Sequence, residues 1–407
     1  MNLIVQKYGG TSVGNIERIN NVADRVIKEY KKGEKVVVVV SAMGDTTDDL
    51  VELMNKVTDN PSPREVDMLL TTGEQVSIAL LSMAIHEKGY PAISLTGSQV
   101  KIETNDKHNE ALIKNIDNHR IEEELEKDKI VVVAGFQGVN SRDDFTTLGR
   151  GGSDTTTVAL AASLNADRCE IYSDVEGIFT TDPKIVDEAS KLDYISYDEM
   201  LELANLGAEV LHPRAVELAK TYNLQLYIAS SFNYKKGTIV KGVEEMEKKK
   251  NVAGVTQDEH EIKVTIQKVP DQPGMAGKLF SKLAQNEINV DMIIQNLQYN
   301  NLNDITFTIN EKDVVKSKTI LARVVKELGA GNYNINEDVA KVSIVGAGMI
   351  STHGIAAKMF ATLGEADINI QMITTSDIKI SCLIKQEKAE QAVRALHDAF
   401  KLADINE

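Results

Sequence analysis

The sequence predicts an α/β first half built on a mostly parallel sheet, followed by a duplicated α+β module. Three observations support this class of fold. Apolar runs alternate with helical patterns through residues 1 to about 230, and a repeat with an offset of 80 residues occupies the second half. A chain of 407 residues also exceeds what one hydrophobic core usually serves, so two or more domains are expected.

The first half contains six runs whose length and apolar content are typical of strands. The run Val36–Val40 is apolar on both faces, which indicates a central strand covered on each side. Between the first two runs, apolar residues from Ile16 to Tyr30 fall at helical spacing, and Gly33 is placed to end that helix. Strands separated by helices predict a mostly parallel sheet with helices on both faces. The predicted strands are Leu3–Tyr8, Lys35–Ser41, Ala92–Leu95, Ile130–Phe136, Glu170–Ser173 and Leu224–Ser230.

The second half begins after a highly charged segment, Lys235–Lys250, which predicts an exposed connection. The stretch that starts at Gly274 aligns with the stretch that starts at Gly354, and the Ile-Asn pairs after Glu287 and Asp367 keep the same offset. A period near 80 residues is too long for a solenoid and indicates duplication of one small module. Chance similarity between two amphipathic helices is the alternative, and the matched spacing argues against it.

The composition excludes some classes of function. A formal net charge of −16 argues against a nucleic-acid partner, because such a protein repels a phosphate backbone. The sequence has no run of about 18 apolar residues, so no membrane span is expected. Its start resembles a strand rather than an export signal, and Cys169 and Cys382 match no paired spacing, which favours a reduced cytoplasmic location. An anionic ligand would need a local group of cations.

The segment Lys7–Val13 combines a lysine, two glycines and two hydroxyl residues at the end of the first predicted strand. Gly9 and Gly10 allow a tight turn that exposes successive N–H groups, which suits phosphate oxygens. Ser12 offers a further donor, and Lys7 can neutralise charge on a phosphoryl group during transfer. The GxxxxGK pattern of a Walker loop is absent. The alternative is an ordinary strand-to-helix turn with a surface lysine.

A second glycine loop, Leu148–Asp154, precedes a predicted helix at Thr155–Leu164. Ser153 or Asp154 can cap this helix, whose N-terminal amides favour an anion. That Asp154 is only a cap is the alternative reading. Arg150 can bind a carboxylate through its bidentate guanidinium group.

A third segment, Ser173–Lys184, follows a strand and is rich in acidic and hydroxyl residues. Sheets of α/β proteins bind ligands at the carboxyl ends of their strands. An Asp-Pro pair at Asp182 marks a turn, so this acid can also be structural. Together the three loops are expected to bring Lys7, Arg150 and Lys184 to one edge of the sheet, where they would supply the local cations.

These three segments, in this order, resemble the signature segments of aspartate kinases, and the duplicated module resembles a pair of ACT domains. The resemblance covers essentially the whole chain. It implies an amino-acid-kinase fold, an αβα sandwich with a mostly parallel central sheet, at residues 1–245. Ferredoxin-like α+β ACT modules would follow at residues 252–335 and 336–407, and whether residues 252–260 pair with the second module stays open.

The resemblance implies ATP-dependent phosphorylation of aspartate and assigns residue roles by motif. Lys7 and Asp154 would be catalytic, with Asp154 organising the site around the lysine. Glu74 would bind the ammonium group of L-aspartate, and Arg150 its α-carboxylate. The remaining substrate-binding residues would be Ser41, Thr47, Gly151, Gly152 and Ser153. ATP would contact Lys7, Tyr8, Gly9, Gly10, Ser12, Ser173, Asp174, Phe179 and Lys184, and Mg²⁺ would arrive with it.

Three positions depart from the pattern of relatives, so the side-chain contacts to the nucleotide stay open. Phe179 stands where tyrosine often occurs, and Lys184 where arginine does. Glu209 replaces a lysine that contacts the nucleotide in some members, and it is therefore left out of the site.

The ACT pair would be regulatory, with lysine, threonine or both as inhibitors. Because the ACT modules of relatives pair between chains, a homo-oligomer, at least a dimer, is expected. A shorter regulatory chain that starts near Met246 is an open question. Effector contacts are expected at Asp271, Met275, Ala276 and Gln295 in the first copy and at Asn369 and Ile370 in the second. For each of these residues, simple packing of the modules is the alternative.

Two rival functions stay open. A related kinase acting on glutamate, acetylglutamate or a nucleotide is one, but Glu74, Arg150 and the ACT pair favour aspartate. A catalytically inactive amino-acid sensor is the other, and intact Lys7, Asp154 and Arg150 argue against it.

Two further patterns are interpreted as structural. Ile344–Ser351 resembles the opening of a dinucleotide fingerprint, but it lies inside the repeat, so a module loop is expected. His212 precedes a proline and is expected to be a turn or packing residue rather than a metal ligand.

Overall fold

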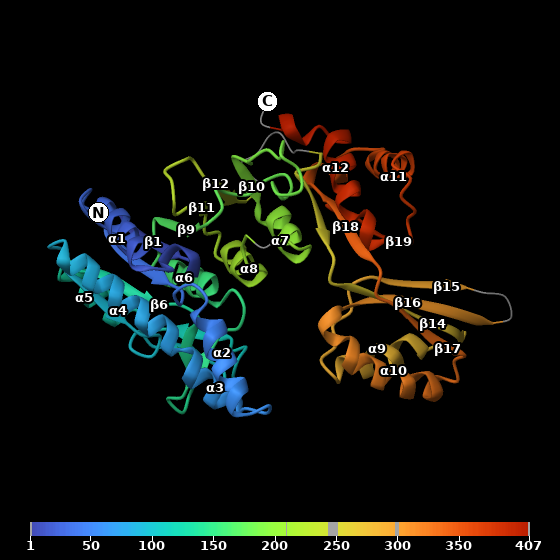
Figure 1. Ribbon diagram of the computed structural model, residues 1–407, viewed down its shortest axis with the longest axis horizontal. Helices are drawn as coiled ribbons and strands as arrows, with labels where there is room; N and C mark the ends of the chain where they lie inside the picture. Colours follow the sequence, from blue (N-terminus) through green and yellow to red (C-terminus); the bar gives the residue numbers. More distant parts are fainter. Residues whose placement is uncertain (1, 209, 243–250, 298–300, 406–407) are drawn as a thin grey trace.

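The computed structural model describes residues 2–208, 210–242, 251–297 and 301–405. These residues form an N-terminal unit around a large sheet and two smaller modules, each a four-stranded sheet with helices (Figure 1). The second module packs on the N-terminal unit at helix α7 (Tyr197–Asn205).

The N-terminal unit is organised by an eight-stranded sheet with the order β10-β12-β11-β9-β1-β2-β6-β3. Every neighbouring pair is parallel except β11 and β12, which confirms the predicted mostly parallel sheet. The strands are β1 (Leu3–Tyr8), β2 (Lys35–Val40), β3 (Ala92–Leu95), β6 (Ile130–Ala134), β9 (Arg168–Ser173), β10 (Tyr194–Ser196), β11 (Leu226–Ser230) and β12 (Thr238–Lys241).

The valine run in β2 explains why helices cover both faces of this sheet. Val36, Val38 and Val40 pack with helices α1 and α4, whereas Val37 and Val39 pack into the core on the opposite face. Alternate residues of a strand point to opposite faces, so a continuous apolar run is buried on both. The helices on the first face are α1 (Ile16–Tyr30) and α4 (Thr72–Glu87), and those in the opposite core are α5 (His119–Glu126), α6 (Gly152–Ser163), α7 and α8 (Pro213–Thr221).

A second, smaller sheet in this unit was not predicted. Its order is β5-β4-β7-β8, and helix α3 (Pro63–Leu70) packs on β8. Its strands have only three or four residues, too short for a clear periodic signal. They are β4 (Ile102–Thr104), β5 (Ile113–Ile116), β7 (Gln137–Val139) and β8 (Phe145–Thr147), and α2 (Thr46–Val57) precedes α3.

The two C-terminal modules have equivalent sheets, with the orders β15-β16-β14-β17 and β19-β20-β18-β13. The fourth strand of the second module, β13, precedes the first module in the chain and pairs with β18. The first module comprises β14 (Glu261–Pro270), α9 (Met275–Ala284), β15 (Ile293–Leu297), β16 (Leu302–Asn310), α10 (Val314–Leu328) and β17 (Asn332–Asn336). The second comprises β13 (Gly254–Asp258), β18 (Ala340–Val345), α11 (Ile355–Glu365), β19 (Met372–Thr375), β20 (Lys379–Ile384) and α12 (Ala389–Ala399).

Backbone geometry repeats between the modules at the offset found in the sequence. Gly274 and Gly354 precede α9 and α11 with φ of 91° and 88°. Glu287 and Asp367, which follow the same helices, both have φ of 55°. Because non-glycine residues rarely adopt positive φ, this coincidence supports duplication rather than chance similarity.

The charged connection is shorter than predicted. Thr238–Lys241 forms β12 inside the large sheet, where Thr238 and Val240 are fully buried, so the expected exposed segment Lys235–Lys250 was wrong for these residues. Thr238 and Val240 alternate there with half-buried residues, and β12 pairs with β10 and β11. The expectations for Glu209 and Met246 lie outside the described residues. Ile344–Ser351 ends β18 and forms a 3₁₀ turn, a module loop as predicted.

One helical stretch, Pro63–Glu87, is long and apolar enough to cross a membrane by length and composition. It consists of two helices, α3 and α4, and half of its apolar window is buried inside the fold. Ile78, Leu81 and Ile85 of α4 pack in the core with α1 and the sheet. The stretch therefore packs as core helices of the N-terminal unit.

Candidate active site

A cavity of about 580 Å³ opens at the carboxyl ends of the central strands. Lys7 is the penultimate residue of β1, Ser41 directly follows β2, and Phe136 lies two residues after β6. These strands are parallel, so their carboxyl ends meet at one edge of the sheet. The cavity is lined by Lys7, Gly10, Ser41, Ala42, Gly44, Thr47, Val66, Leu70, Glu74, Asn109, Phe136, Thr147 and residues 149–154.

Lys7 and Asp154 form an ion pair inside this cavity. The Lys7 Nζ lies 2.7 Å from Asp154 Oδ1, and each side chain is 11% exposed. The expectation that Ser153 or Asp154 caps α6 was wrong, because the helix starts two residues before Asp154, with Gly151 as N-cap residue and no side-chain cap. Asp154 lies in the first turn of α6, so its carboxylate is free to hold the lysine.

Two glycines allow the loops around this pair to approach closely. A Cβ atom at Gly10 would lie 2.9 Å from the Ala42 carbonyl oxygen, and the Gly44 N–H donates to the Gly10 carbonyl at 3.1 Å. Gly151 has φ of 66°, and a Cβ atom there would overlap the side chain of His212. Side chains at either position would separate loops that together form the cavity.

Glu74 and Arg150 supply opposite charges to the same cavity. Glu74 is 3% exposed, and its Oε1 accepts a hydrogen bond from the Ala42 N–H at 3.1 Å. Burial raises the pKa of Glu74 to about 8. Its Oε2 is covered from solvent and has no hydrogen-bond partner among the described residues. Arg150 is exposed and lines the cavity.

The structure thus brings together every residue expected to bind the acceptor substrate. Ser41, Thr47, Glu74 and residues 150–154 line one cavity with Lys7. An ammonium, two carboxylates and a phosphoryl group would each find a partner of suitable charge there. Lys7 and Arg150 supply the local cations that the acidic net charge requires for an anionic ligand, and Glu74 and Asp154 line the cavity beside them.

The residues expected around ATP belong to two groups, one in the first glycine segment (Lys7–Val13) and one in the third segment (Ser173–Lys184). Tyr8 is fully buried and stacks on Tyr172 at 5.1 Å, so only its backbone can face a ligand. The hydroxyl of Ser12, which is 1% exposed, donates to Ser231 Oγ at 2.8 Å rather than pointing into the cavity. The Ser231 hydroxyl in turn donates to the Ser173 carbonyl at 3.0 Å, which joins the first glycine loop to the third segment.

The third segment lies beside the cavity rather than in its lining. Asp174 and Lys184 are exposed, and Phe179 is half-buried and bridges to Lys191. Lys184 does not line the cavity with Lys7 and Arg150. Gly9, at the junction of both groups, donates its N–H to the Tyr172 carbonyl at 3.2 Å.

Two residues that shape the cavity were missed by sequence reasoning. Arg214 Nη1 donates to the Leu148 carbonyl at 2.5 Å, and its Nη2 donates to the Ala111 carbonyl at 3.0 Å. It thereby joins two loops that both reach the cavity. Asn109, on one of these loops, lines the cavity itself. His212 caps α8, its ring nitrogen accepting from the Arg214 N–H at 3.4 Å, which confirms the structural reading of that histidine.

The residues expected to bind an effector lie before α9, in its first turn and after it in the first module, and after α11 in the second. Asp271 is exposed and accepts from the Asn303 side chain at 2.9 Å, whereas Met275 is buried in the core of the first module. Ala276 and Ile370 pack against the two module cores. Gln295 and Asn369 are exposed. Asp271, Gln295 and Asn369 therefore offer polar groups to solvent, whereas Met275 fits the packing alternative.

Comparisons with known proteins define the class. A model of the amino acid kinase family matches residues 2–230, and an ACT domain model matches residues 262–325 and 342–400. The fold and cavity are therefore those of a kinase of the amino acid kinase family that carries two ACT regions.

Individual relatives identify the group of amino acid kinases to which the chain belongs. The aspartokinase of Bacillus sp. (strain MGA3) is 51% identical over 403 residues, covering 99% of this chain and 98% of that protein. Aspartokinase 2 of Bacillus subtilis (strain 168) is 50% identical over 403 residues, with the same coverage. The chain belongs to the aspartokinases, and it is an aspartate kinase with ACT domains and allosteric regulation.

Solved structures of an aspartokinase are similar to this chain over nearly its whole length. The structure of E. coli aspartokinase III in complex with aspartate and ADP (R-state) has a TM-score of 0.83 at 25% identity, covering 98% of this chain and 99% of that one. The complex of the same enzyme with lysine and aspartate (T-state) has a TM-score of 0.76 at 26% identity, covering 98% and 99%.

Proposed function

We propose that the chain transfers the γ-phosphoryl group of ATP to the β-carboxylate of L-aspartate, giving 4-phospho-L-aspartate. The observation that carries this proposal is the Lys7–Asp154 ion pair, which lies in a cavity also lined by Gly10, Glu74 and Arg150. The product would enter lysine, threonine and methionine biosynthesis.

The reaction needs no general base, because a carboxylate is already ionised at neutral pH. The obstacle is repulsion between the acceptor carboxylate and the triphosphate. Lys7 would neutralise charge on the phosphoryl group in flight, and Asp154 would fix the lysine in position. Arg150 would bind the α-carboxylate, and Glu74 would accept from the α-ammonium, which leaves the β-carboxylate as the only free nucleophile.

ATP would lie between the first glycine loop and the third segment. The backbone of Gly9 and Gly10 would face the phosphates, and Ser173, Asp174, Phe179 and Lys184 would surround the nucleotide. Mg²⁺ would enter as part of the MgATP substrate, held mainly by phosphate oxygens and water.

The ACT pair would bind lysine, threonine or both and lower activity, acting in a homo-oligomer that is at least a dimer. The lysine complex of E. coli aspartokinase III supports lysine as the first effector to test. A cytoplasmic location fits the two buried free thiols of Cys169 and Cys382.

A hydroxamate assay with L-aspartate, L-glutamate and N-acetylglutamate tests the proposed reaction, because hydroxylamine traps acyl phosphates. We expect turnover with aspartate that depends on MgATP and exceeds turnover with either other acid at least tenfold. Preference for another acid would overturn the substrate assignment, and no turnover with any acid would favour the inactive sensor.

A further inference from the structure

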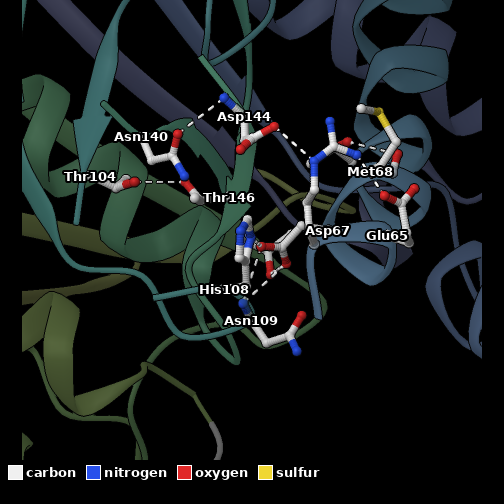
Figure 2. A network of polar contacts seen from close by, with 12 residues as sticks. Glu65, Asp67, Met68, Thr104, His108, Asn109, Asn140, Asp144 and Thr146 are labelled. Atoms are coloured by element: carbon white, nitrogen blue, oxygen red, sulfur yellow. Dashed lines mark hydrogen bonds and ion pairs between the residues drawn. The ribbon is translucent and has the colours of Figure 1, made fainter. Parts of the chain in front are cut away.

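The acceptor cavity is bordered by a loop, residues 105–112, whose shape depends on one buried carboxylate. Asp67 of α3 is fully buried and accepts a hydrogen bond from the Thr147 hydroxyl at 2.6 Å. Its other contacts are the His108 Nδ1 at 2.6 Å and the backbone N–H of Asn109 at 3.1 and 3.2 Å. Figure 2 shows Asp67 between His108 and Asn109, whose side-chain amide extends away from the carboxylate.

Asn109 has a backbone conformation that requires such support. Its φ is 68°, in the left-handed region, where asparagine is tolerated better than most residues. The Ala111 N–H donates to the Thr147 carbonyl at 2.9 Å, and Arg214 binds the Ala111 carbonyl, so the loop is fixed after Asn109 as well as at His108 before it. Backbone strain of this kind persists where the surroundings determine the conformation, and it is frequent at ligand sites.

The side chain of Asn109 has an unused acceptor. Its Oδ1 is covered from solvent and has no partner among the described residues, and the same is true of Glu74 Oε2. Both residues line the acceptor cavity. A covered acceptor without a donor costs about 1–3 kcal/mol, so two of them in one cavity indicate a ligand that brings donors. The carboxylates of a substrate bring none, whereas an ammonium group brings three N–H donors.

We propose that Asn109 is a further substrate-recognition residue, whose side-chain oxygen accepts a hydrogen bond from the α-ammonium group of the acceptor amino acid beside Glu74. Asp67 is the positioning residue that holds Asn109 there, since it binds the Asn109 backbone and Thr147 at once. This inference rests on the proposed phosphorylation of an amino acid. It assigns the loop at residues 105–112, which none of the sequence motifs includes, to substrate selection.

Replacement of Asn109 tests the contact directly. Asn109→Gly removes the amide and keeps the left-handed backbone. We expect it to raise the KM for aspartate about 10- to 100-fold, as for loss of a hydrogen bond to a charged group, with the KM for ATP within about twofold. Asn109→Asp keeps an acceptor of the same shape and should stay within about threefold of wild type. If Asn109→Asp is as impaired as Asn109→Gly, the acceptor role is overturned.

Asn105→Gly is the control for loop order, because it removes a hydrogen bond that closes the base of the same loop, and Asn105 does not line the cavity. Asn105 Oδ1 accepts only from the Leu112 N–H, at 3.0 Å, among the hydrogen bonds described for its side chain. An equal rise in the KM for aspartate in this variant would show that loop order, and not recognition, is responsible.

A double-mutant cycle tests the positioning role of Asp67. Asp67→Asn should raise the KM for aspartate, and adding Asn109→Gly should raise it no further, because both changes remove one contact. Additive effects would reduce Asp67 to a structural residue and overturn its assignment. The wild-type enzyme is measured in parallel. If the wild type phosphorylates aspartate and Asn109→Gly has the same KM for aspartate, this inference alone is refuted. If the wild type does not phosphorylate aspartate, the proposed function is refuted.

Discussion

The pH dependence of aspartate binding follows from the burial of one carboxyl group. Glu74 is 3% exposed, and its burial raises its pKa to about 8. Glu74 lines the cavity in which aspartate is expected to bind. The ionisation of Glu74 should therefore dominate how the KM for aspartate changes in that range.

The size of the effect can be worked out from this pKa. If only ionised Glu74 binds the ammonium group, the KM for aspartate scales as 1 + 10^(pKa − pH). With a pKa of about 8, roughly 3% of the free enzyme carries the anion at pH 6.5, and roughly 76% does so at pH 8.5. The KM for aspartate should fall about 25-fold between these values.

Initial rates from a coupled ADP-release assay at saturating MgATP measure this directly. The KM for ATP is the internal control and should change less than about twofold. Glu74→Gln should have a higher KM for aspartate at every pH and no slope. A wild-type KM for aspartate that changes less than threefold, or an unaltered slope in Glu74→Gln, would refute the reasoning.

The remaining predictions concern stability, catalysis and cofactor. The pKa of Glu74 is higher in the folded than in the unfolded state, so the folded state binds more protons. The free energy of unfolding should therefore fall by up to about 5 kcal/mol from pH 4.5 to 8. Urea unfolding should show a smaller change of this free energy with pH in Glu74→Gln, and an equal change would refute the prediction. Lys7→Ala should lower kcat at least about 10²-fold with lysine binding by calorimetry intact, and unchanged turnover contradicts its role. Lys341 is 4% exposed and pairs with Asp291 at 2.6 Å and with buried Glu261. Lys341→Met leaves the Glu261 carboxylate without its cation and should lower the free energy of unfolding in urea by about 3 kcal/mol. A decrease below about 1 kcal/mol would show that Glu261 is solvated in another way. EDTA should abolish turnover without a change in melting temperature, because Mg²⁺ is expected to arrive with ATP; a lower melting temperature would indicate a resident metal.

Six of the eight strands of the large sheet could be predicted because they depend on local sequence, whereas β10 and β12 were missed. Leu3–Tyr8 and Ala92–Leu95 have the predicted bounds, and α1 spans the predicted Ile16–Tyr30. Apolar runs and helical spacing of apolar residues in the local sequence indicate such elements. The small sheet β5-β4-β7-β8 could not be predicted, because its short strands gain their hydrogen bonds only from partners distant in the chain.

Residues of the candidate site could be predicted where they belong to a sequence motif, but not where their role depends on contacts with residues distant in the chain. Lys7, Arg150 and Asp154 belong to glycine-rich loops whose composition indicates anion binding, and they line one cavity. Asn109 and Arg214 belong to no motif, because their value depends on contacts with Asp67, Leu148 and Ala111 elsewhere in the sequence. Ser12 shows the converse: its motif indicates a phosphate donor, but Ser231 binds its hydroxyl.

Regulation by the ACT pair requires a physical connection to the nucleotide, and the second module provides one at Thr180, next to Phe179. The Thr180 carbonyl accepts from the Val255 N–H of β13 at 2.7 Å, and its hydroxyl lies 3.0 Å from the buried ring of His397 in α12. Val186, which follows Lys184, is part of the second module's hydrophobic core. Repacking of that core by an effector would therefore change the contacts of the segment expected to hold ATP. Since coupling between two binding sites is reciprocal, ATP must then alter effector affinity by the same factor.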